Sequence, residues 1–320
     1  MLLLLPGSAA WAAGEPDDSG AIWSLSLENS SITPTTPADR NYTNGIGLNW
    51  TSAPGAMPDA LAGFSHWLWG SGSDRLSLGI FQQIFTPDDT TSNPANPFQR
   101  PYAGYLALHS GLIDDQPNVE NTLSLDLGAV GEIALGEQVQ NSFHRLIGQQ
   151  QNKGWGSQLH DEPTLEISGG RTWRVPLGNV AGLATDVLPA VSVGVGNVMD
   201  YGEAGAVFRI GDNLDADFGP NRLPPSLEGS TVFAPHVTGW YVFLGGDGQA
   251  VAHNLFLQGN TFSSSPHVNI YPLVGEFEAG VAIMVWGMRI SYEQVFQSKT
   301  WHGQDGSIFS YGALQVSARF

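Results

Sequence analysis

The sequence predicts an all-β fold, a transmembrane antiparallel β-barrel of about 12 strands with one short helix in a loop. Three observations lead to this prediction. Short segments of alternating polarity recur along the 320 residues, only 13% of the residues are charged while 40 are Gly, and the chain ends in an alternating segment that closes with Phe320. Such alternation places one set of side chains against lipid and the other set in the lumen of a barrel.

The first alternating segment shows the pattern clearly. Trp23, Leu25 and Leu27 alternate there with small or polar residues. The pattern recurs in segments 45–50, 75–80, 122–127, 191–195, 240–244 and 314–320, and residues 280–290 are apolar on both faces. The alternate positions are mostly Ser, Gly, Asn and Gln, as expected of a polar lumen. On this pattern alone, a soluble β-sandwich remains the alternative.

Aromatic residues and the last residue favour the membrane barrel over the sandwich. Aromatic side chains near the ends of predicted strands fit the girdles at a membrane interface. These residues are Trp67, Trp69, Trp173, Trp240, Tyr241 and Trp286. An alternating last strand that ends in Phe320 also resembles the assembly signal of bacterial outer-membrane proteins. We therefore expect a location in the outer membrane of a Gram-negative bacterium.

Residues 1–13 are interpreted as the end of a signal peptide. A run of leucines is followed by small residues, with an Ala-x-Ala pattern at Ala10 and Ala12. The alternative is an apolar first strand, which Pro6 and Gly7 would interrupt. We expect residues 14–320 to form a single barrel domain, because no Pro-rich or charge-rich linker divides them.

Composition excludes several other classes. Beyond the N-terminus the sequence has no run of about 20 apolar residues, so a membrane-spanning helix is not predicted. The net charge of −18 argues against nucleic acid as a partner, and it also requires a cation or a local basic group at any contact with an anionic lipid. The absence of Cys removes disulfides and a cysteine nucleophile from consideration.

One segment, 136–148, breaks the period of two. Val139, Phe143 and Leu146 follow helical spacing and predict a short amphipathic helix that ends at Gly148. Gln140 and His144 lie one turn apart on its polar side. We expect the apolar face to pack against the barrel or a covering loop, and Gln140 and His144 to face Asn29 and Thr43.

His144 is the best-placed general base in the sequence. No Gly-x-Ser-x-Gly elbow and no His-Glu-x-x-His helix is present. A helix fixes His144 in space, and Gln140 can hydrogen-bond to it or to the water that it activates. The alternative is a polar helix face that is simply solvated.

Three further segments carry candidate ligands. Segments 28–30 and 39–45 are rich in oxygen ligands for a hard cation such as calcium, with a strand–turn–strand as the alternative. Segment 211–219 has three aspartates but lacks the spacing of an EF-hand, so a solvated loop is favoured. Arg100 stands beside aromatic residues and could pair with a phosphate, or it could be structural.

Together these segments resemble the LpxR-type lipid A deacylase family. The resemblance runs over nearly the whole mature chain and is specific in the order and spacing of its parts. Its parts are Glu28-Asn29-Ser30, residues 39–45, Arg100-Pro101-Tyr102-Ala103-Gly104, Gln140-x-x-x-His144, Lys153-Gly154-Trp155, Gly196-Asn197, residues 209–214, residues 217–220 and residues 257–261.

The resemblance implies an outer-membrane enzyme that removes an acyl or acyloxyacyl chain from the lipid A of lipopolysaccharide in a calcium-dependent reaction. It implies His144 as the base that activates water, with Gln140, Asn29, Thr43 and Ser30 as further site residues. Arg100 is expected to bind substrate. Calcium would polarise the ester carbonyl and stabilise the oxyanion, with Asn29 and Glu28 as the predicted metal ligands. We expect the protein to act as a monomer.

Ser30 is the position where this chain departs from the family. The family has Asp after the Asn, so Ser30 removes a carboxylate from the place where a cation or the catalytic His would use it. Glu28 points to the opposite face in a regular strand and could substitute only at a bulge. The alternative function is therefore a barrel of the same family that has lost catalysis and serves as a structural or lipid-binding protein.

Overall fold

The computed structural model of the chain describes residues 20–33, 40–70, 72–227 and 229–320. The predicted signal segment, residues 1–13, lies outside the described residues. None of the helices in the described ranges is long and apolar enough to cross a membrane.

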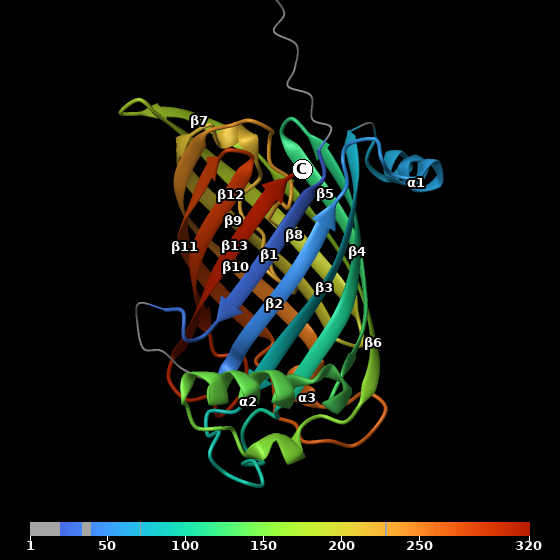
Figure 1. Cartoon of the computed structure of the whole chain (residues 1–320), viewed down its shortest axis with the longest axis vertical. Helices are drawn as coiled ribbons and strands as arrows, with labels where there is room; N and C mark the ends of the chain where they lie inside the picture. The colour runs from blue at the N-terminus through green and yellow to red at the C-terminus, as the bar shows by residue number, and fades with distance from the viewer. Residues whose placement is uncertain (1–19, 34–39, 71, 228) are drawn as a thin grey trace, which may run out of the picture.

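Twelve antiparallel strands of the described residues form a closed barrel (Figure 1). They follow one another around the wall in chain order, β1 pairs with β13, and the pairing of β6 with β8 completes the circle. The prediction of about 12 strands is confirmed. The wall strands are β1 (Ile22–Asn29), β2 (Asn41–Thr51), β3 (Ser73–Thr86), β4 (Ala103–Gln116), β5 (Val119–Val130), β6 (Glu162–Trp173), β8 (Leu183–Gly196), β9 (Met199–Asp212), β10 (Gly239–Asn254), β11 (Leu273–Val285), β12 (Met288–Ser298) and β13 (Ile308–Arg319).

Other elements lie at the two ends of the barrel. The short strand β7 (Val175–Val180) pairs with β8 alone and projects as a hairpin. The remaining elements are α1 (Asp59–Trp69), α2 (Gly136–Ile147), α3 (Leu255–Gln258), η1 (Glu132–Ala134), η2 (Gly154–Ser157) and η3 (Leu214–Ala216).

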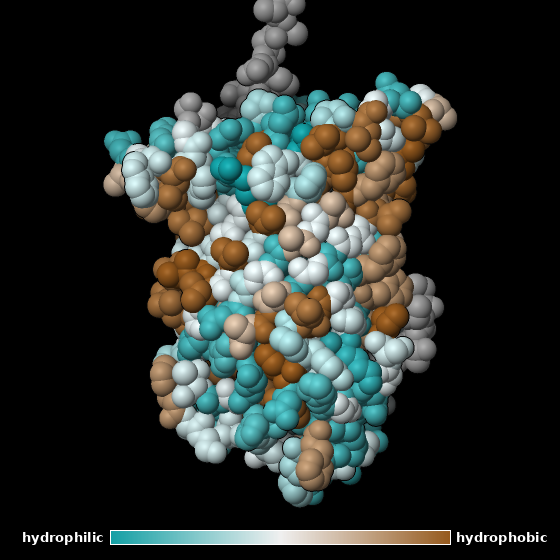
Figure 2. Space-filling view, turned by 180° about the vertical axis from the view of Figure 1, so that it is seen from behind, coloured by the Kyte–Doolittle hydropathy of each residue, from teal (hydrophilic) through white to brown (hydrophobic). Residues whose placement is uncertain are grey.

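The predicted alternation is confirmed on the wall. Trp23 and Leu25 are exposed on the outside, whereas Ser24, Ser26 and Glu28 of the same strand are buried. Apolar side chains accordingly cover much of the outer surface (Figure 2). The end of the barrel opposite the C-terminus is mainly hydrophilic (Figure 1 and Figure 2). Trp240 and Trp286 are exposed as expected of an interfacial girdle. Tyr241 instead points inward and is fully buried, because it occupies a lumen-facing position of β10.

The ends of the barrel can be distinguished by their connections. The end at which β1 begins and β13 finishes also carries tight turns, such as Trp286-Gly287 between β11 and β12. The longest connection, residues 131–161, lies at the opposite end and contains α2. Outer-membrane barrels have short periplasmic turns and longer extracellular loops. We therefore assign the α2 end to the extracellular side.

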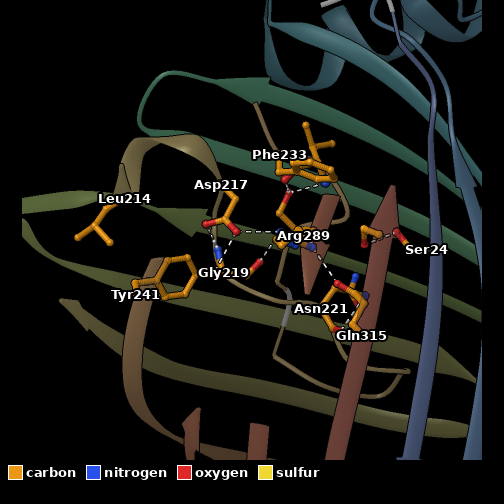
Figure 3. A network of polar contacts seen from close by, with 12 residues as sticks. Ser24, Leu214, Asp217, Gly219, Asn221, Phe233, Tyr241, Arg289 and Gln315 are labelled. Atoms are coloured by element: carbon orange, nitrogen blue, oxygen red, sulfur yellow. Dashed lines mark hydrogen bonds and ion pairs between the residues drawn. The ribbon is translucent and has the colours of Figure 1, made fainter. Parts of the chain in front are cut away.

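The segment 213–238, which joins β9 to β10, folds into the lumen and is called the plug below. Its Asp217 is fully buried, and one carboxylate oxygen pairs with Arg209 of β9 at 2.6 Å. The other oxygen pairs with Arg289 of β12 at 2.9 Å (Figure 3). Tyr241 of β10 donates a hydrogen bond to the same carboxylate at 2.8 Å. These contacts hold the plug to three strands at once.

Deeper in the lumen, Arg222 of the plug pairs with Glu276 at 2.9 Å, Glu278 at 3.3 Å and Glu293 at 3.0 Å. The backbone N–H of Leu223 donates to Glu28 of β1 at 2.6 Å. The acidic segment 211–219 is therefore only in part the solvated loop that its sequence favours. Asp212 and Asp215 are exposed, whereas Asp217 is buried, because two buried arginines compensate its charge.

Candidate active site on the outer wall

The helix α2 lies on the outside of the barrel at its extracellular end (Figure 1). The residues just before it are fixed to β3, because Gln82 donates a side-chain hydrogen bond to the carbonyl of Ala134 at 2.6 Å. Its first residue, Gly136, rests on Gly104 of β4, where an added Cβ would lie 2.9 Å from the Gly136 nitrogen. Two glycines thus allow the helix backbone to approach the strand backbone closely.

The buried side of α2 is its polar side. Gln140, Asn141 and His144 are buried, whereas Phe143 is 54% and Leu146 is 82% exposed. The expectation that the apolar face packs against the barrel is therefore wrong. A helix on the outside of a membrane barrel has lipid or its interface as the apolar phase, so the apolar face turns outward and the polar face turns to the wall.

His144 is held in one tautomer by its surroundings. Its Nδ1 lies 2.7 Å from the carbonyl oxygen of Gln150 in the segment that follows the helix. A carbonyl can only accept, so in the neutral ring Nδ1 carries the proton and Nε2 is the basic nitrogen. Asn141 fixes the same segment, because it donates to the carbonyl of Asn152 at 3.2 Å and accepts from the Asn152 N–H at 2.9 Å.

Gln140 is oriented by Trp155. The indole N–H of this buried tryptophan donates to Oε1 of Gln140 at 3.0 Å, and its ring packs against Tyr102 with centroids 4.9 Å apart. This bond assigns the oxygen and nitrogen of the amide, so that Nε2, with its two N–H groups, is on the opposite side. No sequence pattern predicts a role for Gln150 or Asn152, and Trp155 stands in the sequence only as part of the Lys153-Gly154-Trp155 motif.

Asn29, Ser30 and Thr43 lie where β1 ends and β2 begins, at the same end of the barrel as α2. Asn29 accepts a hydrogen bond from the Ser31 N–H at 2.7 Å. Ser30 is fully buried, and its N–H donates to the Thr43 carbonyl at 3.2 Å. The Thr43 hydroxyl lies 2.7 Å from that of Thr86 at the end of β3.

The structure thus places Asn29, Ser30 and Thr43 together at the extracellular ends of β1 and β2, beside the end of β3, and β3 also supports α2. Thr43 stands at a shift in the β2–β3 register, where one residue of β2 has no direct partner. A joint site of these residues with His144 stays a prediction.

Glu28 lies on the other side of the wall. It is buried in the lumen, where it accepts hydrogen bonds from Tyr42 and from the Leu223 N–H, each at 2.6 Å. The β1 strand pairs regularly on both sides, so Asn29 points outward. The structure does not bring the predicted metal ligands Asn29 and Glu28 together.

The donor set on the outer wall is neutral. Within the described residues, no group of three or more His, Asp or Glu side chains is placed to hold a metal ion. The oxygens near the end of β1 come from Asn29, Ser30 and Thr43, while Asp39 lies outside the described residues. Calcium prefers charged carboxylate oxygens, so these neutral groups do not fit a tight calcium site.

Arg100 is also on the lumen side. Its guanidinium lies over the Phe85 ring, 4.7 Å from the centroid, and only 6% of the residue is exposed. Burial lowers the pKa of Arg100 to about 9. The predicted substrate-binding arginine is therefore not on the face that carries His144.

The family comparison and one solved structure agree with this architecture. A family model described as outer membrane protein LpxR matches residues 1–320. The solved structure of LpxR from Salmonella typhimurium is similar with a TM-score of 0.78 and 21% identity, over 93% of this chain and 100% of that one. The β domain of a Bordetella autotransporter is similar with a TM-score of 0.44 and 11% identity, over 95% and 99% of the two chains. A search of curated protein sequences finds no significant match.

Proposed function

Because the chain belongs to the LpxR family of outer membrane proteins, a lipid A deacylase family, we propose that it is an ester hydrolase that removes an acyl or acyloxyacyl chain from lipid A. One observation carries the proposal. His144 is buried on the polar face of a helix on the outer wall, with its Nδ1 bound to a backbone carbonyl. A base in this place can act on a lipid of the outer leaflet.

In the proposed reaction, Nε2 of His144 takes a proton from water, and the water oxygen attacks the ester carbonyl carbon. The C–O ester bond then breaks, and the imidazolium returns its proton to the leaving oxygen. The products are a free fatty acid and a hydroxyl on the remaining lipid, without an acyl-enzyme. General base catalysis of this kind contributes about 10²–10⁴-fold.

The other predicted site residues have supporting roles in this proposal. Gln140, oriented by Trp155, would donate from Nε2 to the water or to the oxyanion. Asn29, Ser30 and Thr43 would supply neutral hydrogen-bonding groups beneath the helix. Fixed donors in a water-poor site stabilise a developing oxyanion without reorganisation.

The exposed apolar face of α2 supports the choice of a lipid substrate. Val139, Phe143 and Leu146 turn away from the wall, so acyl chains could lie along them while the ester reaches the polar face. An amphipathic helix with this arrangement is typical of an interfacial segment.

Calcium dependence is a separate part of the proposal, since only the resemblance implies it. The described oxygens at the site are neutral, which predicts weak binding of a hard divalent cation. The steps above therefore use only residues of the chain.

The second candidate is a family member without catalysis, and Ser30 is the observation that favours it. A fully buried Ser stands where the family has Asp. The barrel, the plug and α2 would then serve structure or lipid binding alone.

Mass spectrometry of lipid A, incubated with the purified protein across a calcium series, tests both candidates. We expect the parent to deacylate lipid A, His144→Ala to lose about 100-fold or more, and Ser30→Asp to increase calcium affinity and activity together. His160→Ala is the matched control, because His160 is an exposed histidine of the same connection and should leave turnover unchanged.

The outcomes separate the candidates. An inactive parent with an active Ser30→Asp variant would support the non-catalytic alternative. If neither form acts on lipid A at saturating calcium, the enzyme proposal fails.

A further inference from the structure

A cavity of about 90 Å³ lies inside the barrel on the extracellular side of the plug. Tyr42, Phe85 and Tyr311 line it from the wall, Leu223 lines it from the plug, and Phe256 lines it from α3. It is separate from the face beneath α2, because these wall side chains point into the lumen. We call it the vestibule, and nothing in the proposed reaction uses it.

Arg100 lines the vestibule. Unlike Arg209, Arg222 and Arg289, the buried arginines of the plug contacts, it has no carboxylate among the described residues paired with its positive charge. Arg209, Arg222 and Arg289 each pair with a carboxylate at 2.9 Å or less. In the part of the chain that the structure describes, no hydrogen bond or ion pair reaches Arg100, and its Nε is fully buried without a partner. Its guanidinium lies over the Phe85 ring.

The carboxylate that acts electrostatically on Arg100, that of Asp88, is already engaged by other groups. Asp88 acts on Arg100 only at a distance. Its carboxylate accepts from Asn41 at 3.3 Å and from the Asp305 N–H at 3.1 Å, and it pairs with Arg40 at 3.3 Å. Burying a guanidinium that lacks a hydrogen-bonded anion is costly. Arg100 therefore has the geometry of a side chain that binds an anion, and not that of a structural arginine whose hydrogen bonds are all made within the protein.

The lining beside Arg100 is mixed, and its aromatic and aliphatic part sets the kind of anion. Phe85 and Phe256 stack with centroids 4.3 Å apart, and Ile270 and Val274 also line the space. The remaining carboxylate of the lining, Glu276, is engaged by Arg222 at 2.9 Å and by Gln297 at 2.6 Å. A dianion would lose more hydration and meet more repulsion from Glu276 and Asp88 than a monoanion.

We propose that the vestibule binds a carboxylate with an apolar chain, with the head on Arg100 and the chain against Phe85 and Phe256. A guanidinium holds a carboxylate through two parallel hydrogen bonds, which would satisfy the buried Nε. The cavity holds the head and the first carbons of an alkanoate, and because it is partly open the end of a longer chain can extend out of it. The inference does not depend on lipid A hydrolysis, because Arg100 lies on the other side of the wall from His144.

Titration calorimetry of the folded full chain in lipid nanodiscs tests the inference, with hexanoate as the probe. Hexanol supplies the chain without the charge, acetate supplies the head without the chain, and hexyl phosphate supplies a dianion. We expect hexanoate to bind at least about tenfold more tightly than each of the other three. Preference for hexyl phosphate would overturn the carboxylate assignment, and equal binding of hexanol would overturn the role of Arg100.

The matched variants are Arg100→Met and Arg171→Met. Arg171 is exposed near the periplasmic end of β6, so its loss should leave hexanoate binding unchanged. Arg100→Met should weaken hexanoate binding about tenfold or more, since a charge-assisted pair is lost. Arg100→Met leaves no described carboxylate without a pairing partner, so this variant should not lower the urea midpoint of unfolding. Hexanoate binding at parental affinity in folded Arg100→Met would overturn the proposal.

Arg100→Lys is the second variant, and it keeps the measurement decisive if the Met variant folds poorly. Lysine retains the positive charge but loses the planar guanidinium group. Hexanoate should therefore bind the Lys variant more weakly than it binds the parent, but more tightly than hexanol binds the Lys variant. A Lys variant that binds hexanoate and hexanol equally would argue against an anion site.

Discussion

The close contact between Gly104 and Gly136 makes a sharp prediction about the outer-wall site. In Gly104→Ala, the new Cβ would lie 2.9 Å from the nitrogen and 3.0 Å from the Cα of Gly136. Carbon atoms in favourable contact are about 3.5–4.0 Å apart. Since β4 is paired on both sides by β3 and β5, the wall cannot give way, and α2 must move outward.

The size of the effect follows from these distances. Restoring ordinary contact requires the start of α2 to move by roughly 0.5–1 Å. Overpacking of this kind costs about 1–3 kcal/mol, which the barrel as a whole can absorb. A displacement of about 1 Å in a catalytic group lowers rates about 100-fold. We therefore expect Gly104→Ala to fold and to deacylate lipid A about 100-fold more slowly.

Gly202→Ala is the matched control, because a Cβ at that strand glycine of β9 would meet nothing within 4 Å. The assay is the initial rate of acyl release from lipid A, followed by mass spectrometry, for both variants after their heat-modifiable migration on gels shows a folded barrel. Equal rates for Gly104→Ala, Gly202→Ala and an active parent would refute the argument that this contact positions His144.

Three further perturbations test other contacts. Trp155→Phe removes the hydrogen bond to Gln140 but keeps an aromatic ring, so deacylation should fall about tenfold, as expected for loss of one bond worth about 1.5 kcal/mol. Because Trp155 is buried, the smaller ring leaves a cavity and should also lower the urea midpoint of unfolding. Asp217→Asn leaves the buried Arg289 without its carboxylate and leaves Arg209 with Asp186 alone, so it should lower the free energy of unfolding in lipid vesicles by about 3 kcal/mol. Hydrogen bonds from Ser92 and then Thr91 lower the pKa of Asp89 from 3.8 to about 2. The loop is therefore stabilised above pH 4 and loses this stabilisation as the pH falls through about 2. An NMR titration of the Asp89 carboxyl should show a midpoint at about pH 2.

The wall could be predicted from the sequence because each strand carries its own signal. Leu25 and Ser26 differ in polarity, and a period of two assigns them to lipid and lumen without knowledge of the partner strands. The same logic misplaced Tyr241 as a girdle residue. Its position in β10 faces inward, and the reason for a buried tyrosine there is Asp217, 24 residues away.

The plug could not be predicted for a related reason. Its buried ion pairs join Asp217 to Arg289, which is 72 residues further along the chain, and no local periodicity records a contact of that range. Three aspartates in one loop indicate solvent or a cation when they are considered alone. Only the closed barrel shows that two arginines from different strands meet one of them in the lumen.

The helix α2 shows how the surrounding solvent decides the meaning of an amphipathic pattern. Spacing alone predicted the helix and both of its faces correctly, yet the apolar face is exposed and the polar face is buried. In a soluble protein the apolar face would lie inside, because water is the solvent on every side. On a barrel wall the surrounding phase is lipid, so a helix that must bury Gln140 and His144 does so against the strands. Once a barrel is predicted, a buried histidine on the polar face of an outer loop helix becomes the expected place for a base that acts on the surrounding lipid.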